Sequence, residues 1–225
     1  MGKSYKQYCA LAKTFEIVGE RWTPLIIREL MFGGRRFADL IEGLPGIGAS
    51  VLASRLKDLE SRELVYKAHL PPPAASSIYQ LTERGASLGE KLLCLAEWGM
   101  ELLGGKADDE VFQNRWILVH IKTAMDRELA EALSETYILK VDEDIYRIKV
   151  DHGELEAAQL IEIEKADAVI TATAAVLLAL HDNQLSFDDV VEQGVYKVEG
   201  ELAAGRRFYE LFIKAKRPTS TEVAA

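Results

Sequence analysis

The sequence has 225 residues and a mass of 25.1 kDa, with 48% hydrophobic and 28% charged residues. This composition is typical of a folded globular protein, and it excludes a disordered chain, a collagen and a coiled-coil rod. The net charge is −9, but residues 1–105 carry 13 Lys and Arg against 12 Asp and Glu, whereas residues 106–225 carry 14 against 24. Nucleic acid therefore stays open as a partner of the first half, and the acidic second half should face away from phosphates.

The chain shows no pattern of export or membrane insertion. Cys9 and Cys94 are too few for a disulfide framework, and the first twenty residues contain no charged stretch followed by an apolar run. The longest apolar run, residues 172–180, is far shorter than the roughly 18 to 20 residues that a membrane span needs. We therefore expect a cytoplasmic protein with no membrane segment.

Up to residue 105, apolar residues recur every three or four positions, which predicts a series of short amphipathic helices. Glycines at 19, 33, 34, 46 and 48 mark their ends. Residues 65–70 and 78–81 are predicted strands, joined by a proline-rich loop over 71–77 and followed by a helix from 82 to about 103. This order, with a β-hairpin after the third helix, is typical of a winged helix-turn-helix module.

A glycine pair and a polar cluster within residues 103–109 indicate a domain boundary. We predict domains over 1–105 and 106–216 and a flexible tail over 217–225, with an α+β fold class overall. The expected elements of the second domain are a helical stretch over 111–133, strands over 137–141, 145–150 and 154–160 with a turn at 151–153, a strand over 168–172, helices over 174–181 and 187–192 capped by Thr173 and Ser186, a strand over 195–199 and a helix over 202–212.

Several motifs of the first domain occur in a recognisable order: YCALAKTFEIVGERWTPLIIREL at 8–30, GGRRFADL at 33–40, LPGI at 44–47, LASRLKDLE at 52–60, YQLTERG at 79–85 and WG at 98–99. Across residues 8–99 the chain thus resembles the HxlR-type transcriptional regulators. The resemblance implies a dimer that binds a pseudo-palindromic operator in double-stranded DNA, with one recognition helix per half-site. Here that helix would be residues 48–62, with an apolar side that faces the core.

The resemblance also places the residues that would contact DNA. Small side chains on the recognition helix would let it approach the groove floor, while Arg55 and Lys57 would reach phosphates or a guanine edge. Arg35 and Arg36, at the start of the preceding helix, suit phosphate contact. The alternative is that each basic side chain is plain solvated surface. The full set of candidates is Arg35, Arg36, Ala49, Ser50, Ala53, Ser54, Arg55, Lys57 and the wing residue Ser77.

The expected wing departs from the family pattern, because no basic residue follows the prolines at 71–73. Wing contacts would then depend on Ser76, Ser77 and backbone amides, so that DNA binding would neutralise fewer phosphates and have a modest affinity.

Cys9 occupies the position at which some relatives sense oxidants or electrophiles, and Lys6 and Lys13 nearby would favour a thiolate. Against this role, a cysteine beside Tyr8 and Leu11 also fits inert core or dimer surface, and Ala10 replaces the proline that is common after it.

The first and last helices of the module carry a surplus of apolar residues, which favours dimerisation; the alternative is that the second domain covers them.

Residues 130–212 resemble a sterol-carrier-protein-like domain in the order of their strands and helices. Such domains enclose an apolar tunnel, so the resemblance implies a small apolar ligand. The apolar helix expected at 174–181 is equally consistent with a plain core.

The sequence offers no catalytic or metal-binding motif. Its histidines, at 69, 120, 152 and 181, have no paired spacing, and we expect no metal, no cofactor and no enzymatic activity. Two functions follow: a dimeric DNA-binding transcriptional regulator modulated by a hydrophobic ligand or by thiol oxidation, or a hydrophobic-metabolite or lipid binding protein whose winged helix is degenerate. The placement of the basic residues favours the regulator.

Overall fold

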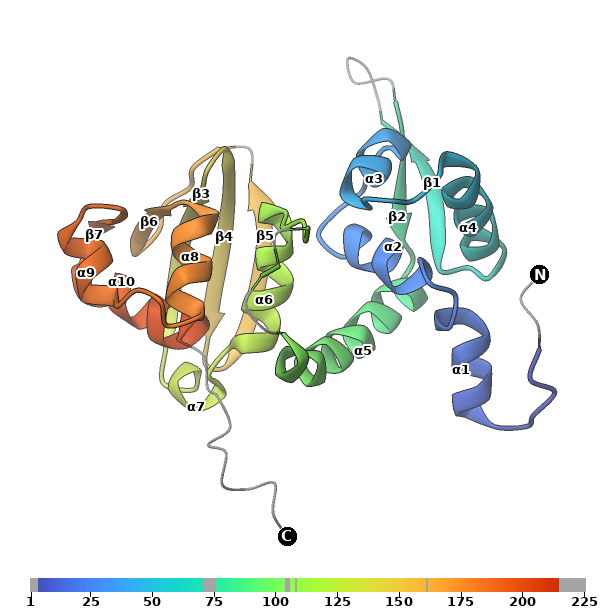
Figure 1. Cartoon of the computed structure of the whole chain (residues 1–225), viewed down its shortest axis with the longest axis horizontal. Helices are drawn as coiled ribbons and strands as arrows, with labels where there is room; N and C mark the ends of the chain where they lie inside the picture. Colours follow the sequence, from blue (N-terminus) through green and yellow to red (C-terminus); the bar gives the residue numbers. More distant parts are fainter. Residues whose placement is uncertain (1–3, 71–75, 104–105, 108, 161, 215–225) are drawn as a thin grey trace, which may run out of the picture. The chain divides into compact units, whose positions relative to one another are not determined.

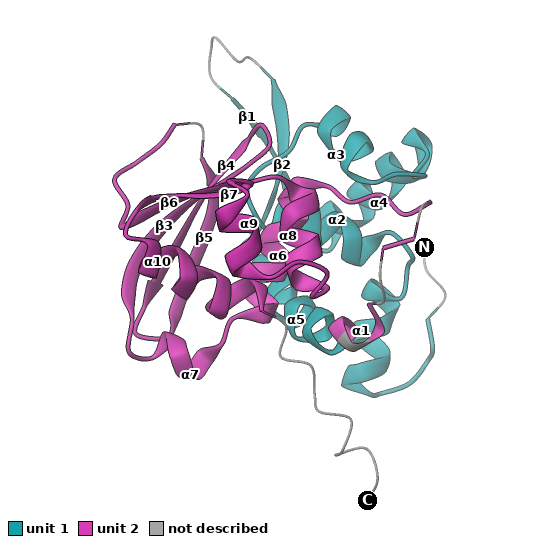
Figure 2. Ribbon diagram, turned by 60° about the vertical axis from the view of Figure 1, so that its left-hand side comes forward, with its two compact units in different colours: residues 1–98 teal, residues 99–225 magenta. Residues whose placement is uncertain are grey.

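The computed structural model describes residues 4–70, 76–103, 106–107, 109–160 and 162–214. The chain divides into two compact units, Met1–Trp98 (unit 1) and Gly99–Ala225 (unit 2), which are coloured separately in Figure 2. The domain limits expected from the sequence, at 105/106 and 216/217, stay predictions. The expected tail and residues 71–75 of the wing loop lie outside the described residues.

Unit 1 is built from short helices and a β-hairpin (Figure 1). In chain order its elements are α1 (Ala10–Val18), α2 (Thr23–Leu30), α3 (Phe37–Gly43), α4 (Ala49–Ser61), β1 (Val65–His69), β2 (Ser77–Leu81) and α5 (Glu83–Gly99), which a 3₁₀ turn at Met100–Leu102 follows. This order confirms the winged helix-turn-helix pattern expected from the sequence.

The core of unit 1 lies where α2, α3 and α4 meet. Ile26 and Ile27 of α2, Leu40 of α3 and Leu52 of α4 are each completely buried. Burying an aliphatic side chain of this size contributes about 1.5 to 3 kcal/mol, so this cluster holds the helices together. It also includes Leu30, Leu44, Ile47, Leu56, Leu59, Leu64 and Val65.

Unit 2 is a sheet with helices packed on it. Its elements are η2 (Asn114–Trp116), α6 (Ile117–Ala124), α7 (Arg127–Ala130), β3 (Ser134–Val141), β4 (Asp144–Asp151), β5 (Glu154–Leu160), β6 (Ala168–Ala172), α8 (Ala174–His181), α9 (Phe187–Glu192), β7 (Tyr196–Gly200), α10 (Leu202–Phe208) and the π-helical turn η3 (Tyr209–Ile213). The described strands pair in the order β5-β4-β3-β6-β7, with β3 and β6 parallel and the other pairs antiparallel.

One face of this sheet is covered by helices. Along β4, Tyr146, Ile148 and Val150 are completely buried, whereas Arg147 and Lys149 between them are partly exposed. Successive side chains of a strand point to opposite faces, so the buried residues mark the face on which α6, α8 and α10 lie in Figure 1. The described part of the chain contains no helix that is long and apolar enough to span a membrane.

The sequence predicted where most helices and strands of unit 2 begin and end, but one predicted helix was wrong. Thr173 and Ser186 cap α8 and α9 as expected: the hydroxyl of Thr173 accepts from the Val176 N–H at 3.3 Å, and that of Ser186 accepts from the Asp189 N–H at 3.2 Å. The single helical stretch expected over 111–133 is wrong. It is interrupted before Asp126, whose carboxylate accepts the N–H groups of residues 128 and 129 and so starts α7.

Two histidines hold the end of the last helix of unit 2. The Nε2 atom of His120 lies 3.0 Å from the Phe212 carbonyl oxygen, and Nδ1 of His181 lies 3.3 Å from that of Ile213. A carbonyl oxygen can only accept, so each of these nitrogens carries a hydrogen. The ring centroids are 4.6 Å apart. Burial, followed by repulsion from His181, lowers the pKa of His120 to about 4 although its carbonyl bond acts in the opposite direction.

Unit 2 should therefore lose stability as the pH falls from about 6.5, the ordinary pKa of an unfolded histidine, to about 4. In this window the unfolded chain takes up a proton that folded His120 does not. We expect a loss of about 2 kcal/mol between pH 7 and pH 4.5, measured by hydrogen exchange of the β3 and β4 amides. The loss should shrink in His120→Gln and persist in His152→Gln, because His152 is exposed. An equal loss in both variants would contradict this assignment.

Candidate nucleic-acid interface

A glycine-containing turn fixes the start of α4. Gly46 has a φ of +88°, which L side chains rarely adopt, and Gly48 is the extended residue that precedes the helix. Between these glycines, Ile47 donates its N–H to the Leu44 carbonyl at 3.0 Å, and both apolar side chains are buried in the core of unit 1. The buried side chains of Leu44 and Ile47 thus fix the turn to the core, and α4 begins directly after it, at Ala49.

The exposed side of α4 carries small residues and one lysine. At about 100° per residue, Ala49, Ser50, Ala53, Ser54 and Lys57 fall within an arc of about 140°. All of them are exposed. The leucines at 52, 56 and 59 lie on the opposite side and are buried. We call these five exposed residues the groove face.

Arg55 does not lie on the groove face. Its direction on the helix is about 160° away from that of Lys57, and its side chain is only 21% exposed. Its Nη1 atom lies 3.3 Å from Oε2 of Glu20, in the connection between α1 and α2. The structure therefore brings together the other helix residues proposed from the sequence and separates Arg55 from them.

Arg35 and Arg36 are placed by α3 and the hairpin. The N–H of Arg35 donates to the Tyr79 carbonyl at 2.9 Å, and the N–H of Tyr79 donates back at 2.7 Å, so Arg35 extends the free edge of β2. Arg36 is the residue before α3, and its N–H donates to a carboxylate oxygen of Asp39 at 3.1 Å. Because Asp39 already brings negative charge to this helix start, a phosphate contact here would depend on the arginine side chains.

The hairpin supplies two further polar side chains that the sequence analysis missed. Lys67 is in register with Tyr79, and its Nζ atom lies 5.7 Å from the centre of that ring. His69 is in register with Ser77, whose hydroxyl lies 3.0 Å from Nδ1 of His69. Lys67 and His69 are two positions apart on β1, so they share a face of the hairpin. Period-two alternation in the sequence would have identified this pair.

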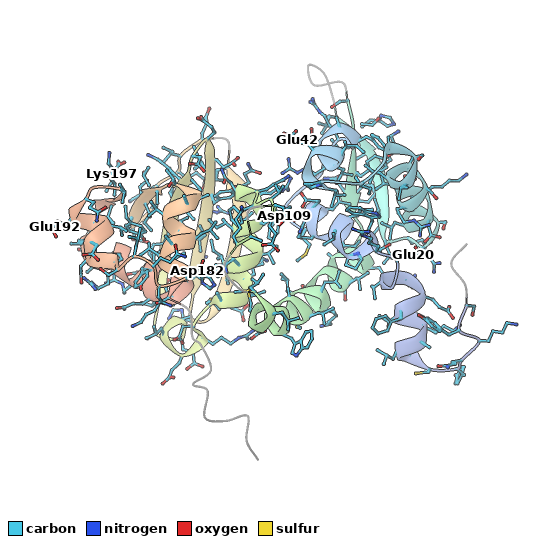
Figure 3. The ribbon with its side chains drawn as sticks, in the orientation of Figure 1. Glu20, Glu42, Asp109, Asp182, Glu192 and Lys197 are labelled. Carbon is cyan, nitrogen blue, oxygen red and sulfur yellow. The ribbon has the colours of Figure 1, made fainter. Side chains whose placement is uncertain are left out.

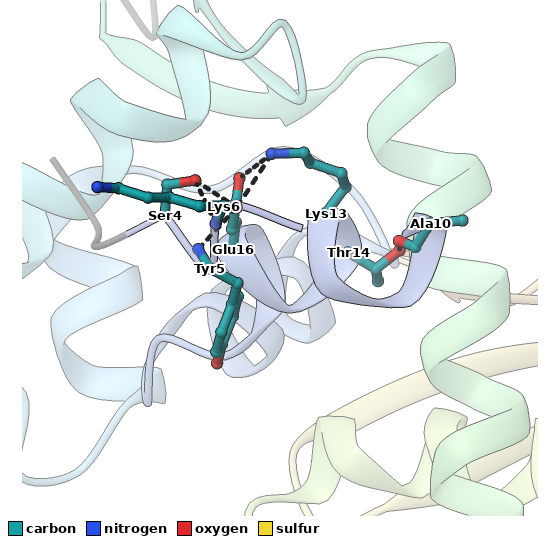
Figure 4. A network of polar contacts seen from close by, with 7 residues as sticks. All are labelled: Ser4, Tyr5, Lys6, Ala10, Lys13, Thr14 and Glu16. Carbon is teal, nitrogen blue, oxygen red and sulfur yellow. Dashed lines mark hydrogen bonds and ion pairs between the residues drawn. The ribbon is translucent and has the colours of Figure 1, made fainter. Parts of the chain in front are cut away.

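The N-terminal segment folds back onto α1 through Glu16 (Figure 4). The Glu16 carboxylate accepts hydrogen bonds from the Ser4 hydroxyl at 2.8 Å, from the Tyr5 N–H at 3.0 Å and from Lys13 at 3.1 Å. These hydrogen bonds lower the pKa of Glu16, with the bond from Ser4 contributing most and the bond from Lys13 next.

Cys9 is exposed at the start of α1. The Lys13 ammonium, expected to act on its thiol, binds Glu16.

Unit 1 also exposes large apolar side chains on its first and last helices. Tyr8 is fully exposed, and Leu11 and Phe15 on α1 are 64% and 47% exposed. On α5, Leu95 and Trp98 are 56% and 60% exposed. Two further leucines of α5, Leu88 and Leu92, pack against the core of unit 1 instead and so do not belong to this surplus.

Comparisons with known proteins match both parts of the chain. Residues 17–106 match the family described as HxlR-like helix-turn-helix, and residues 117–212 match the SCP-2 sterol transfer family. These matches confirm the two resemblances seen in the sequence.

Individual relatives match the first part. The HTH-type transcriptional regulator YodB of Bacillus subtilis is 42% identical over 78 residues, which are 35% of this chain and 70% of YodB. The HTH-type transcriptional regulator MT3179 of Mycobacterium tuberculosis is 39% identical over 94 residues, 42% of this chain and 59% of that protein. The solved structure of reduced YodB has 34% identity and a TM-score of 0.39, over 45% of this chain and all of that one.

If the groove face and the hairpin lie on DNA, each lysine that neutralises a phosphate should contribute to the salt dependence of binding. We expect Lys57→Ala and Lys67→Ala each to reduce the slope of log K against log salt concentration by about 1. Fluorescence anisotropy at several salt concentrations measures this slope. Lys91→Ala, an exposed change on α5, is the matched control. Slopes equal to that of the unchanged protein in both test variants would contradict the interface.

Proposed function

Since this chain belongs to the HxlR-like helix-turn-helix family, we propose that it is a transcriptional regulator that binds double-stranded DNA as a homodimer. In this proposal residues 1–105 bind DNA and dimerise, and residues 106–216 form the sterol-carrier-like domain. The operator is pseudo-palindromic, with one α4 in the major groove of each half-site. The relatives, named as transcriptional regulators, support a regulator rather than an enzyme.

The groove face of α4 is the observation that carries this proposal. An α-helix fits the major groove, and side chains no larger than serine at 49, 50, 53 and 54 allow its backbone to approach the base edges. Lys57 supplies a positive charge on the same face. The candidate phosphate ligands Arg35 and Arg36 come from the start of α3 and Ser77 from β2, and Lys67 of β1 is added to them.

Dimerisation is supported by the unpartnered surface of α1. This helix has nine residues, and Ala12 is its one buried residue in the described structure. Isolated helices shorter than about 12 residues are marginal in water, so α1 needs a surface to pack on. A second copy related by two-fold symmetry provides one, since the apolar residues of α1 and α5 then cover each other.

Leu11→Glu should therefore weaken dimerisation by at least about tenfold, because it places a carboxylate in the apolar contact. Sedimentation equilibrium of the full chain measures the dissociation constant. Val195→Glu, at an exposed apolar position of unit 2, is the control and should leave the constant unchanged. A monomeric parent protein, or a Leu11→Glu dimer of unchanged stability, would contradict the dimer.

The function itself is tested by selecting genomic DNA fragments on the full chain in reducing buffer at physiological salt. We expect enrichment of a two-fold symmetric site whose half-sites are about one helical turn apart. Ala53→Glu should abolish this enrichment, because it brings a carboxylate to the groove floor.

Fragments retained without a common motif would contradict the regulator and favour the hydrophobic-metabolite binding protein.

Modulation by oxidation of exposed Cys9 or by an apolar ligand of unit 2 is part of the same proposal. Repeating the selection with oxidised protein, and with Cys9→Ser, tests the thiol.

A further inference from the structure

The ion pair between Arg55 and Glu20 joins the middle of α4 to the frame of unit 1. Arg55 is on the flank of the helix beside the buried Leu59, and Glu20 is in the connection between α1 and α2, where Figure 3 labels it. The Nη1 and Oε2 atoms are 3.3 Å apart, with the two side chains 21% and 41% exposed. Among the described residues, Arg55 is the side chain of α4 whose ion-pair partner is distant in the sequence, since Asp58 pairs with Arg62 four positions away.

This position matters because of how α4 is seated. Leu52, Leu56 and Leu59 form a stripe along one side of the helix, within about 60° of arc. A cylinder held along one stripe resists being lifted away, but it resists rolling about its own axis much less. An ion pair on the flank of the helix opposes that roll. Rolling would change the angle at which the groove face meets DNA.

Glu20 is itself held in place. Its carbonyl accepts the Thr23 N–H at 3.0 Å, which closes the turn into α2. The guanidinium carbon of Arg21 lies 5.3 Å from the centre of the Trp22 ring, and Trp22 packs against the core of unit 1. The ion pair therefore connects α4 to a fixed point.

We propose that Glu20 and Arg55 are positioning residues for DNA recognition, whose ion pair sets the roll of α4 and so aims the groove face at the bases. This inference rests on the proposed function. It replaces the direct phosphate or guanine contact that the sequence suggested for Arg55. Base recognition needs well-aligned hydrogen bonds, so a change in roll should weaken specific binding without removing a phosphate contact.

The two roles of Arg55 give opposite results for Glu20→Gln. If Glu20 is a positioning residue, the Glu20→Gln substitution should weaken specific DNA binding about two- to fivefold. This is the range that loss of a partly exposed ion pair allows. If Arg55 were a phosphate ligand, the same variant would release it and leave binding unchanged or tighter. Arg55→Gln should also weaken binding, and the salt slope should stay the same; a slope that falls by about 1 would identify a phosphate ligand and overturn the proposal.

The exchanged pair, Glu20→Arg with Arg55→Glu, provides a rescue. It should bind within about twofold of the parent protein, because the ion pair is rebuilt with reversed polarity. A phosphate ligand replaced by glutamate could not be rescued in this way. Asp58→Asn is the matched control, since it breaks a pair with Arg62 within the same stretch of chain and should leave binding unchanged.

A second measurement needs no DNA. Hydrogen exchange of the α4 amides in the free full chain should be faster in Glu20→Gln and return to the parent rate in the exchanged pair. If the parent protein selects no DNA site, the proposed function fails, and the positioning role falls with it. If the parent binds its site and Glu20→Gln neither weakens binding nor speeds exchange, the positioning role alone is wrong.

Discussion

The buried leucine stripe of α4 is the constraint on which unit 1 depends. Leu52, Leu56 and Leu59 must face the core, and this requirement turns the residues at 49, 50, 53, 54 and 57 outward. The preceding turn adds Leu44 and Ile47 to the same core, so the helix is fixed along its length and at its start. Burial of this leucine stripe therefore completes the hydrophobic core and at the same time orients the surface that we assign to DNA.

Unit 2 uses a different arrangement for the same purpose of covering apolar surface. Its helices cover one face of the sheet, and Arg207 of α10 donates to Glu135 of β3 at 3.1 Å, which ties the last helix to the central strand. His120 and His181 donate hydrogen bonds to the carbonyl oxygens of Phe212 and Ile213 in η3, which follows α10. The segment formed by α10 and η3 is therefore held by polar contacts at Arg207 and at the carbonyls of Phe212 and Ile213. The match to the SCP-2 sterol transfer family spans residues 117–212 and so covers these strands and helices.

Local patterns in the sequence were enough to locate most elements. The spacing of apolar residues predicted the helices of unit 1, and Thr173 and Ser186 predicted where α8 and α9 begin. The same reasoning failed at Asp126, because a helical spacing on both sides hid a new cap. It also overlooked Lys67 on β1, although alternation along a strand is a local signal. These two errors came from incomplete use of information that the sequence contains.

The sequence by itself determined most of the elements, the family and the exposed face of α4 that we assign to DNA, because each depends on residues within a few positions of one another. Only the tertiary structure decided which charged and polar groups meet. Arg55 pairs with Glu20, 35 positions earlier, and His120 lies beside His181, 61 positions later. The physical reason is that such contacts depend on where packed helices bring distant side chains, and hydrophobic periodicity carries no information on that.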